Sequence, residues 1–204
     1  MQIGPRYKKA RYLGTPVFSK TQTQKYAMRA GRKQKTGGVG KRRSQKSEYG
    51  RQLMEKQKAR YSYGVSSGQF SKYVKQALQT TGDNAKNLIH ILEGRLDNIV
   101  VRAAFAPTRS AARQMVSHGH ITVNGKTVTI PSYEVSTGDL ISIREGSKKK
   151  VLFAKLDDAL KATKAPAWLT VDADKKVITV AGEPAAEMTD LLFDVRSVLE
   201  FFTR

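Results

Sequence analysis

The stretch RLDNIVVRAAFAPTRSAARQMVSHGHITVNGKTVTI, residues 95–130, changes its hydrophobic period partway along. Apolar residues recur at helical spacing in RLDNIVVRAAF and again in RSAARQMVSH, and Asp97 and Thr108 are placed to cap these two helices. ITVNGKTVTI then alternates with a period of two around an Asn-Gly pair, which favours a type I′ hairpin turn. With LISIR at 140–144 as a third strand, the stretch predicts an αα-βββ module.

Helical patterns precede and follow this module. Before it, an apolar stripe of helical period runs from Phe70 to Leu78, and Asp83 is placed to cap a further helix. After it come a short helical run at 156–162 and two strand patterns, AWLTV and KVITV. The final residues, DVRSVLEFFTR, offer Asp194 as the cap of a helix whose apolar stripe needs a partner surface. We expect that surface on the N-terminal helical unit.

If the terminal helix packs on the N-terminal helices, the αα-βββ module is inserted between two parts of one helical domain. We therefore predict an α+β protein in which a helical domain carries an inserted αα-βββ module and a basic N-terminal extension. The expected parts are a glycine-containing extension at 1–46, a helical domain at 47–94 and 185–204, and an α/β domain at 95–184 with the module at about 95–155.

The charge of the chain points to a polyanionic partner. Lys and Arg number 37 against 17 Asp and Glu, which gives a formal charge of +20 and a pI near 10.2. Residues 1–80 hold 20 of the basic residues and 2 of the acids, and residues 1–47 hold 14 basic residues and no acid. Nucleic acid and an anionic membrane would both suit this charge.

Composition limits the cellular compartments and the cofactors that we expect for this chain. We find no apolar run long enough to span a bilayer and no signal-peptide pattern, so we expect no membrane association. The chain has no cysteine, which excludes disulfides and thiolate zinc sites and favours the cytosol.

The run GRKQKTGGVGKRRSQK, at 31–46, combines glycine with dense positive charge. We expect the extension that contains it to form no core of its own, to be disordered or extended when free, and to be ordered by phosphates when bound. A solubilising basic tail is the alternative.

The run EGRLDNIVVRAAFAPTRSAARQMVSHGHITVNGKTVTIPSY, at 93–133, resembles the RNA-binding module named after small-subunit ribosomal protein four. That module also occurs in tyrosyl-tRNA synthetases, pseudouridine synthases and a small heat-shock RNA-binding protein. SEYGRQLMEKQKARYSYGV before it, and APAWLTVD and VLEFFTR after it, resemble the ribosomal family itself, so the similarity spans about 47–204. We expect the inserted module to bind RNA.

The resemblance implies that the protein is a structural constituent of the small ribosomal subunit, in the cytoplasm. It implies direct binding to a helical junction of small-subunit ribosomal RNA, nucleation of subunit assembly, and a contribution to translational accuracy through ribosomal protein five, among other small-subunit proteins. Many members bind zinc through an N-terminal cysteine cluster, which this chain lacks. We expect no metal, cofactor, membrane partner or small-molecule substrate.

RNA helices hide their base edges, so a junction is recognised through phosphates and 2′-hydroxyls, for which arginine is well suited. Arg109 and Arg113 lie four apart on one helix face. The candidate RNA-binding residues of the module are Arg102, Arg109, Arg113, His118, His120, Asn124 and Lys126. The alternative is a solvated face with a hydrogen-bonded loop histidine.

Two further groups of candidates lie before the module. Tyrosines interleaved with positive charge permit base stacking together with phosphate pairing, although buried core tyrosines would give the same pattern. The candidates in the helical domain are Tyr49, Arg51, Lys56, Lys58, Arg60 and Tyr63. Those in the extension are Lys41, Arg42, Arg43 and Lys46.

Two other classes of function share features with this sequence. RLD in GRLDN could be the catalytic aspartate motif of a pseudouridine synthase, but Asp97 is placed as a helix cap and no further catalytic domain follows, so we predict no enzyme. A synthetase would need a nucleotide-binding half. The alternative that stays open is a free RNA-binding translational regulator or RNA chaperone that carries the same module.

Overall fold

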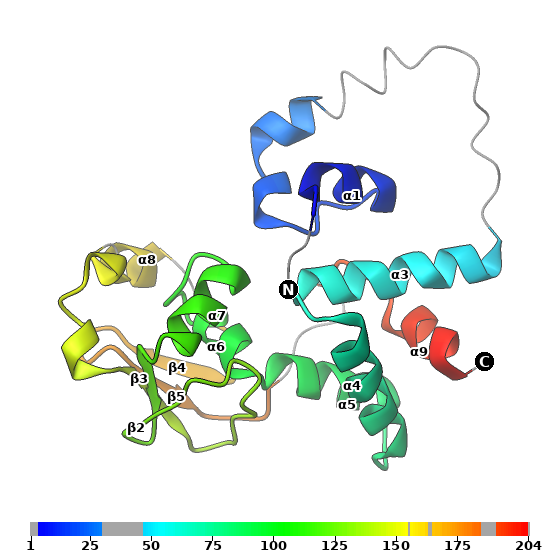
Figure 1. Ribbon diagram of the computed structural model, residues 1–204. Helices are drawn as coiled ribbons and strands as arrows, with labels where there is room; N and C mark the ends of the chain where they lie inside the picture. The colour runs from blue at the N-terminus through cyan, green and yellow to red at the C-terminus, as the bar shows by residue number, and fades with distance from the viewer. Residues whose placement is uncertain (1–3, 30–46, 155, 163–164, 185–190, 204) are drawn as a thin grey trace. The chain divides into compact units, whose positions relative to one another are not determined.

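The computed structural model contains two compact units (Figure 1). Unit 1 comprises Met1–Gln79 and Met188–Arg204, and unit 2 comprises Thr80–Glu187. The structure describes residues 4–29, 47–154, 156–162, 165–184 and 191–203. The described part of unit 1 is helical, whereas unit 2 combines helices with an antiparallel sheet, so the predicted α+β class is confirmed.

The described part of unit 1 is built on α3 (Glu48–Ser62), α4 (Ser67–Gln79) and α9 (Val195–Thr203). Ser47 caps α3, because its Oγ accepts a hydrogen bond from the Gly50 backbone N–H at 3.2 Å. The predicted stripe of α4 is confirmed, with Phe70, Tyr73, Val74 and Ala77 buried.

The terminal helix α9 packs against the earlier helices of the same unit, as its apolar stripe predicted. The ring of Phe201 lies 5.4 Å from that of Tyr49 on α3, and the ring of Phe202 lies 6.2 Å from that of Phe70 on α4. The predicted cap is confirmed: Asp194 accepts hydrogen bonds from the Arg196 N–H and the Ser197 hydroxyl.

The N-terminal segment at 4–29 is folded, which corrects the expectation that residues 1–46 are disordered or extended when free. It folds into α1 (Arg6–Leu13), the 3-10 turn η1 (Ser19–Thr21) and a helical stretch at 24–29. An apolar cluster joins it to α3; the cluster contains Ala10, Leu13, Val17 and Phe18, with Tyr26, Met54 and Tyr61 packed against them. The sequence expectation weighted charge density and overlooked this cluster, whose members include distant residues.

Unit 2 begins with helices and ends in the sheet (Figure 1). Its elements in chain order are α5 (Asn84–Glu93), α6 (Leu96–Arg102), α7 (Arg109–Ser117), β1 (Ile121–Val123), β2 (Lys126–Thr127), β3 (Leu140–Ile143), η2 (Glu145–Ser147), η3 (Val151–Phe153), α8 (Leu156–Ala162), β4 (Leu169–Asp172) and β5 (Val177–Val180). The predicted caps Asp83 and Thr108 are confirmed by hydrogen bonds from the backbone N–H groups of Ala85 and Ala111.

The sheet has five strands in the order β2-β1-β3-β5-β4, and all neighbours are antiparallel. The predicted hairpin is confirmed, since Asn124 and Gly125 have φ of +50° and +78°. The three strands expected in the module are extended by β5 and β4, the strand patterns KVITV and AWLTV. One face of the sheet carries Ile121, Ile141, Ile143 and Ile178 into the core beneath α6 and α7.

Two expectations about unit 2 need correction. The predicted helical domain ended at residue 94, whereas α5 groups with unit 2, because Glu93 accepts hydrogen bonds from Asn98 and Arg102. Asp97 does not cap α6: the N-cap is Arg95, and Asp97 is 2% exposed within the first turn. Its carboxylate forms ion pairs instead.

Within the described residues, no helix has both the length and the apolar character needed to cross a bilayer.

Candidate nucleic-acid interface

Four arginines from the α5–α7 region of unit 2 lie over two buried carboxylates. Glu93, at the end of α5, is 0% exposed, and Asp97, in α6, is 2% exposed. The arginines are Arg95, Arg102, Arg109 and Arg113. These six side chains, which we call the arginine cluster together with Asn98, are four Arg, one Glu and one Asp, a formal charge of +2.

Glu93 holds one half of the arginine cluster. Its carboxylate accepts hydrogen bonds from Nε of Arg102 at 2.9 Å and from Nη2 at 2.7 Å, a side-on bidentate geometry. Asn98 donates to the same carboxylate at 2.5 Å and accepts from Nε of Arg109 at 2.8 Å. A fully buried carboxylate thus fixes Arg102 directly and Arg109 through an amide.

Asp97 holds the other half. Its carboxylate oxygens accept from Nε and Nη2 of Arg95 at 3.0 and 2.7 Å, and Oδ2 also accepts from Nη2 of Arg113 at 2.6 Å. The Arg95 side chain is 6% exposed, whereas those of Arg102 and Arg113 are 29% and 28% exposed. The acids therefore lie inside, and two of the guanidinium groups reach the surface.

This geometry suits phosphate recognition, because a guanidinium held by a carboxylate along one edge is presented in a fixed orientation. The predicted pair Arg109 and Arg113 lies on α7 as expected, and Arg102 of α6 joins them in the arginine cluster. The three arginines were predicted from the sequence, whereas Glu93, Asn98 and Arg95 were not. The closely spaced charged residues of EGRLDN, at 93–98, are the sequence feature that indicates this cluster.

A second group of positive side chains surrounds His120. Nδ1 of this histidine lies 3.0 Å from Oγ of the buried Ser147, and its ring is 6.1 Å from that of the exposed His118. Burial lowers the pKa of His120, and the charges of Lys150, His118 and Arg144 lower it further. Arg144 and Lys150 are exposed, and the sequence analysis did not name them.

The remaining candidates of the module lie in the hairpin. Asn124 is exposed, but its amide is used inside the protein: it donates to Asp139 at 2.8 Å and accepts from the Leu140 N–H at 2.9 Å. These bonds fix the hairpin turn against the start of β3. Lys126 is exposed on β2.

The candidates on α3 divide between the surface and the interior. Tyr49 is 53% exposed and Arg51 is exposed. Lys58 forms an ion pair with Glu55 at 2.6 Å, and the guanidinium of Arg60 lies over the ring of Tyr61. Most of these side chains are therefore engaged with other groups of unit 1.

Two further candidates face other parts of unit 1: Lys56 on α3, and Tyr63 directly after it. Nζ of Lys56 lies 4.2 Å from the ring centre of Phe201, and desolvation, followed by the charge of Arg60, lowers the pKa of Lys56. Tyr63 is 3% exposed and packs edge-on against Phe193, so the prediction that it stacks on a base is wrong. Lys41, Arg42, Arg43 and Lys46 lie outside the described residues.

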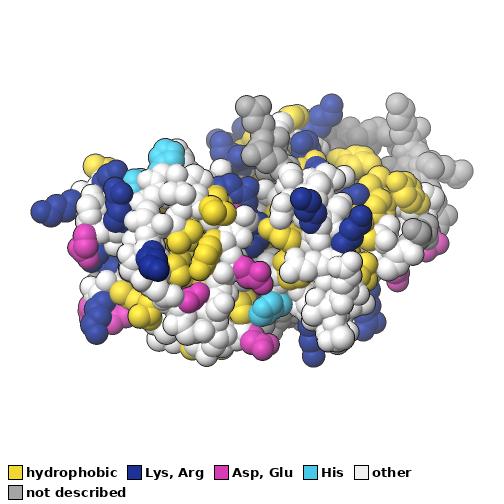
Figure 2. Space-filling model, turned by 60° about the horizontal axis from the view of Figure 1, so that its bottom comes forward, with side chains coloured by type: hydrophobic (Ala, Val, Ile, Leu, Met, Phe, Trp, Pro, Cys, Tyr) yellow, Lys and Arg dark blue, Asp and Glu magenta, His cyan; other side chains and the backbone are white. Residues whose placement is uncertain are grey.

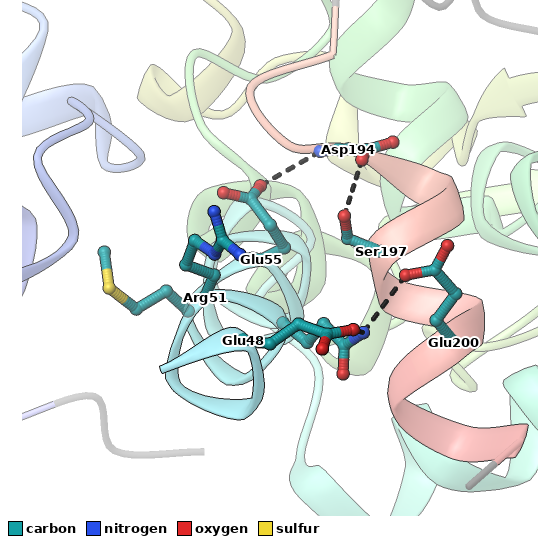
Figure 3. Close-up of a pocket in the computed structure, with 8 residues that line it drawn as sticks. Glu48, Arg51, Glu55, Asp194, Ser197 and Glu200 are labelled. Carbon is teal, nitrogen blue, oxygen red and sulfur yellow. Dashed lines mark hydrogen bonds between the residues drawn. The ribbon is translucent and has the colours of Figure 1, made fainter. Parts of the chain in front are cut away.

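An acidic groove lies between α3 and α9, within unit 1 (Figure 3). It has a volume of about 480 Å³, and its lining residues are Glu48, Arg51, Gln52, Met54, Glu55, Asp194, Ser197 and Glu200. Gln52 donates to Glu200 at 3.0 Å, and Glu55 accepts from the Asp194 N–H at 3.0 Å. The hydrogen bond from Ser197 holds the pKa of Asp194 below its ordinary value, which favours the charged form.

The α3 side of the groove comes from a part of the sequence that is poor in acids. Glu48 and Glu55 are the 2 acids of residues 1–80, and they lie on one side of α3. Lys and Arg side chains, together with Asp and Glu, are spread over the face that Figure 2 presents. Among the described residues, no group of three or more His, Asp or Glu side chains is arranged to hold a metal ion.

Comparison with known proteins supports a nucleic-acid interface in unit 2. A family model described as "S4 domain" matches residues 94–141, the span that holds most of the arginine cluster and the hairpin. The fold and this match define an RNA-binding protein of the S4-domain class.

The match extends over the whole chain. A second family model, "Ribosomal protein S4/S9 N-terminal domain", matches residues 2–93. Proteins called "Small ribosomal subunit protein uS4" from Pseudomonas aeruginosa and Azotobacter vinelandii are each 40% identical over 204 residues, 99% of this chain and 98% of theirs. That of Ectopseudomonas mendocina is 41% identical over 197 residues, 97% of this chain and 95% of its own. The chain belongs to the family of small ribosomal subunit protein uS4.

Proposed function

We propose that this protein is a structural constituent of the small ribosomal subunit and binds small-subunit ribosomal RNA directly at a helical junction. The arginine cluster is the observation that carries the proposal within the structure. Its surface arginines are held by buried acids at distances of 2.6 to 3.0 Å, so little side-chain freedom is left to lose on binding. Similarity over nearly the full length to uS4 proteins supports the same function.

A junction is favoured over a regular duplex by the distribution of positive charge. Unit 2 offers a compact set of oriented arginines, whereas unit 1 offers charge on several helices. RNA recognition of this kind reads the spatial arrangement of phosphates, since the A-form major groove is closed to side chains. The arginine cluster suits a fixed phosphate geometry, and the remaining charge adds affinity without sequence preference.

We also propose that the protein contacts another small-subunit protein, ribosomal protein five. The acidic groove of unit 1 would repel phosphates, so a basic protein neighbour suits it better than RNA. Glu48 and Glu200 line it and are exposed. Through such a contact the protein would contribute to translational accuracy. Changing both glutamates to Gln should weaken binding of purified ribosomal protein five, whereas Asp172→Asn, at a partly exposed carboxylate of β4 in unit 2, should not.

A role in RNA modification is not part of the proposal. The carboxylate of Asp97, the residue an enzyme would need in the RLD motif, is buried and shared by Arg95 and Arg113. Such an ion-paired side chain is unsuited to attack on a base. We also place the protein in the cytoplasm, within the ribosome.

Binding to naked RNA tests the proposal, because a protein that nucleates assembly must bind without its neighbours. We expect the purified protein to bind protein-free small-subunit ribosomal RNA in a filter assay, and affinity to fall steeply with salt, by roughly 0.7 to 0.9 log units per log unit of salt for each phosphate contacted. Arg102→Ala should weaken this binding, while Lys175→Ala, which removes an exposed charge of unit 2, should have little effect. Binding only after other proteins are added would contradict nucleation.

A further inference from the structure

Two tyrosine rings are stacked in the N-terminal segment of unit 1. The rings of Tyr7, on α1, and Tyr26, in the helical stretch at 24–29, have centroids 5.7 Å apart and planes inclined by 23°. Tyr26 is half-buried, whereas Tyr7 is 51% exposed. An aromatic pair that buries one ring and leaves the other half in water presents a flat face on which a third ring can stack.

The segment around this pair is uniformly cationic. Residues 4–29 contain seven Lys and Arg and no Asp or Glu. Lys8 and Arg11 are exposed on α1, and Nε of Arg11 donates to the Tyr7 carbonyl at 3.3 Å, on the same turn of the helix. Positive charge therefore lies on the same short helix as the exposed ring, within one turn of it.

The stacked pair is held in a defined position. Tyr26 packs against the apolar cluster of Ala10, Leu13, Val17 and Phe18, which also contacts α3. The ring of Phe18 lies 5.7 Å from that of Tyr61, and Nζ of Lys9 lies 4.9 Å from the centre of the same ring. The segment is thereby fixed to α3, and the Tyr7 ring does not need to be ordered by its ligand.

We infer that Tyr7 is a stacking platform for an unpaired base of RNA, with Lys8 and Arg11 binding the flanking phosphates. The inference deepens the proposed function and rests on it. An aromatic face accepts any base, and cations beside it bind the backbone, which is the combination that binds single-stranded nucleic acid. A paired base inside a duplex cannot reach the ring, so the site distinguishes looped or bulged RNA from regular helix.

The experiment compares two RNAs with the full-length protein. One is a short single strand with the fluorescent base 2-aminopurine at its centre, and the other is a perfect RNA duplex with the same number of phosphates. Tyr7→Leu removes the ring and keeps an apolar side chain, and Tyr7→Phe keeps the ring. Tyr12→Leu, at a position of α1 that is 66% exposed, is the matched control.

We expect wild type to bind both RNAs and to quench 2-aminopurine. Tyr7→Leu should weaken single-strand binding on the order of tenfold and abolish the quenching, with duplex binding unchanged. Tyr7→Phe and Tyr12→Leu should behave as wild type. Circular dichroism of each variant checks that the helices are intact.

Three results would overturn the inference. Unchanged single-strand binding by Tyr7→Leu would show that no base stacks there, and an equal loss for both RNAs would show that Tyr7 only supports the fold. If wild type binds neither of these RNAs but still binds small-subunit ribosomal RNA in the filter assay, the stacking platform is rejected and the proposed function stands; if it does not bind ribosomal RNA either, both fail. If wild type binds both RNAs and Tyr7→Leu binds the single strand equally well, the stacking platform is rejected and the proposed function is not affected.

Discussion

The carboxylate of Asp97 and the guanidinium of Arg113 form an ion pair across sixteen residues of sequence, with Oδ2 2.6 Å from Nη2 and 3.0 Å from Nε. The same carboxylate binds Arg95, so one buried acid fixes two arginines from different elements. Asp97 is therefore both a part of the core of unit 2 and the residue that orients a candidate RNA contact.

Asp97→Asn should destabilise unit 2 strongly. The change leaves Arg95, whose side chain is 6% exposed, buried without its carboxylate, which costs about 3–5 kcal/mol. Urea unfolding followed by circular dichroism measures the loss. Asp172→Asn, which removes a surface ion pair with Lys175, should cost less than about 1 kcal/mol. If Asp97→Asn is as mild as the control, the buried ion pairs of Asp97 contribute little to the stability of unit 2.

Arg109→Ala and Arg113→Ala should differ in their effect on the stability of unit 2. Arg109 donates a hydrogen bond to the neutral amide of Asn98, and for its loss we expect a stability change within about 1 kcal/mol and RNA binding weaker by about 1–3 kcal/mol. Arg113→Ala should lose both binding and stability, because the buried Asp97 loses a partner. Filter binding normalised to folded protein measures the first effect, and urea unfolding the second. Equal stability losses would contradict this division.

Phe18→Ala should release the N-terminal segment from α3 without unfolding unit 2. Phe18 is 6% exposed in the apolar cluster, and its truncation removes the ring contact with Tyr61. Hydrogen exchange should show lost protection in residues 4–29 and unchanged protection in β1, β3 and β5. The control Met28→Ala, at a 60% exposed position, should leave exchange unchanged. Full protection of the segment in Phe18→Ala would show that other contacts hold it.

The stability of unit 2 should fall as the solution is acidified through the titration of His120. Burial and the neighbouring positive charges lower the pKa of His120, so the unfolded chain binds more protons than the folded one between that lowered pKa and the ordinary value near 6.5. The free energy of unfolding is therefore highest above this interval and decreases as pH falls through it. His120→Gln should remove this part of the pH dependence, and His118→Gln, at an exposed position, should leave most of it. An unaltered pH dependence in His120→Gln would contradict the assignment.

Local signals in the sequence predicted the elements of the fold well. The caps Asp83 and Thr108 and the positive-φ turn at Asn124 and Gly125 depend on residues within a few positions of each other, and all were confirmed. The pairing of β5 with β3 depends on strands far apart in the sequence, so the three-stranded expectation was incomplete.

The candidate site shows the same division. The spacing of Arg109 and Arg113 correctly predicted that they share a face of α7. Asp97 was predicted to be a cap because it lies near a helix start, but it pairs with Arg113 on the next helix. The apolar cluster of the N-terminal segment depends on Met54 and Tyr61 of α3, which composition alone does not reveal. Ion pairs and packing between distant residues decide these cases.

Sedimentation of a cell lysate tests the central claim most directly. The protein, carrying a small affinity tag, would be followed by immunoblot through a sucrose gradient at a magnesium concentration that separates the two ribosomal subunits. We predict that it sediments with the small-subunit peak. Recovery only in the free fraction at the top of the gradient would contradict a ribosomal constituent and favour a free RNA-binding regulator.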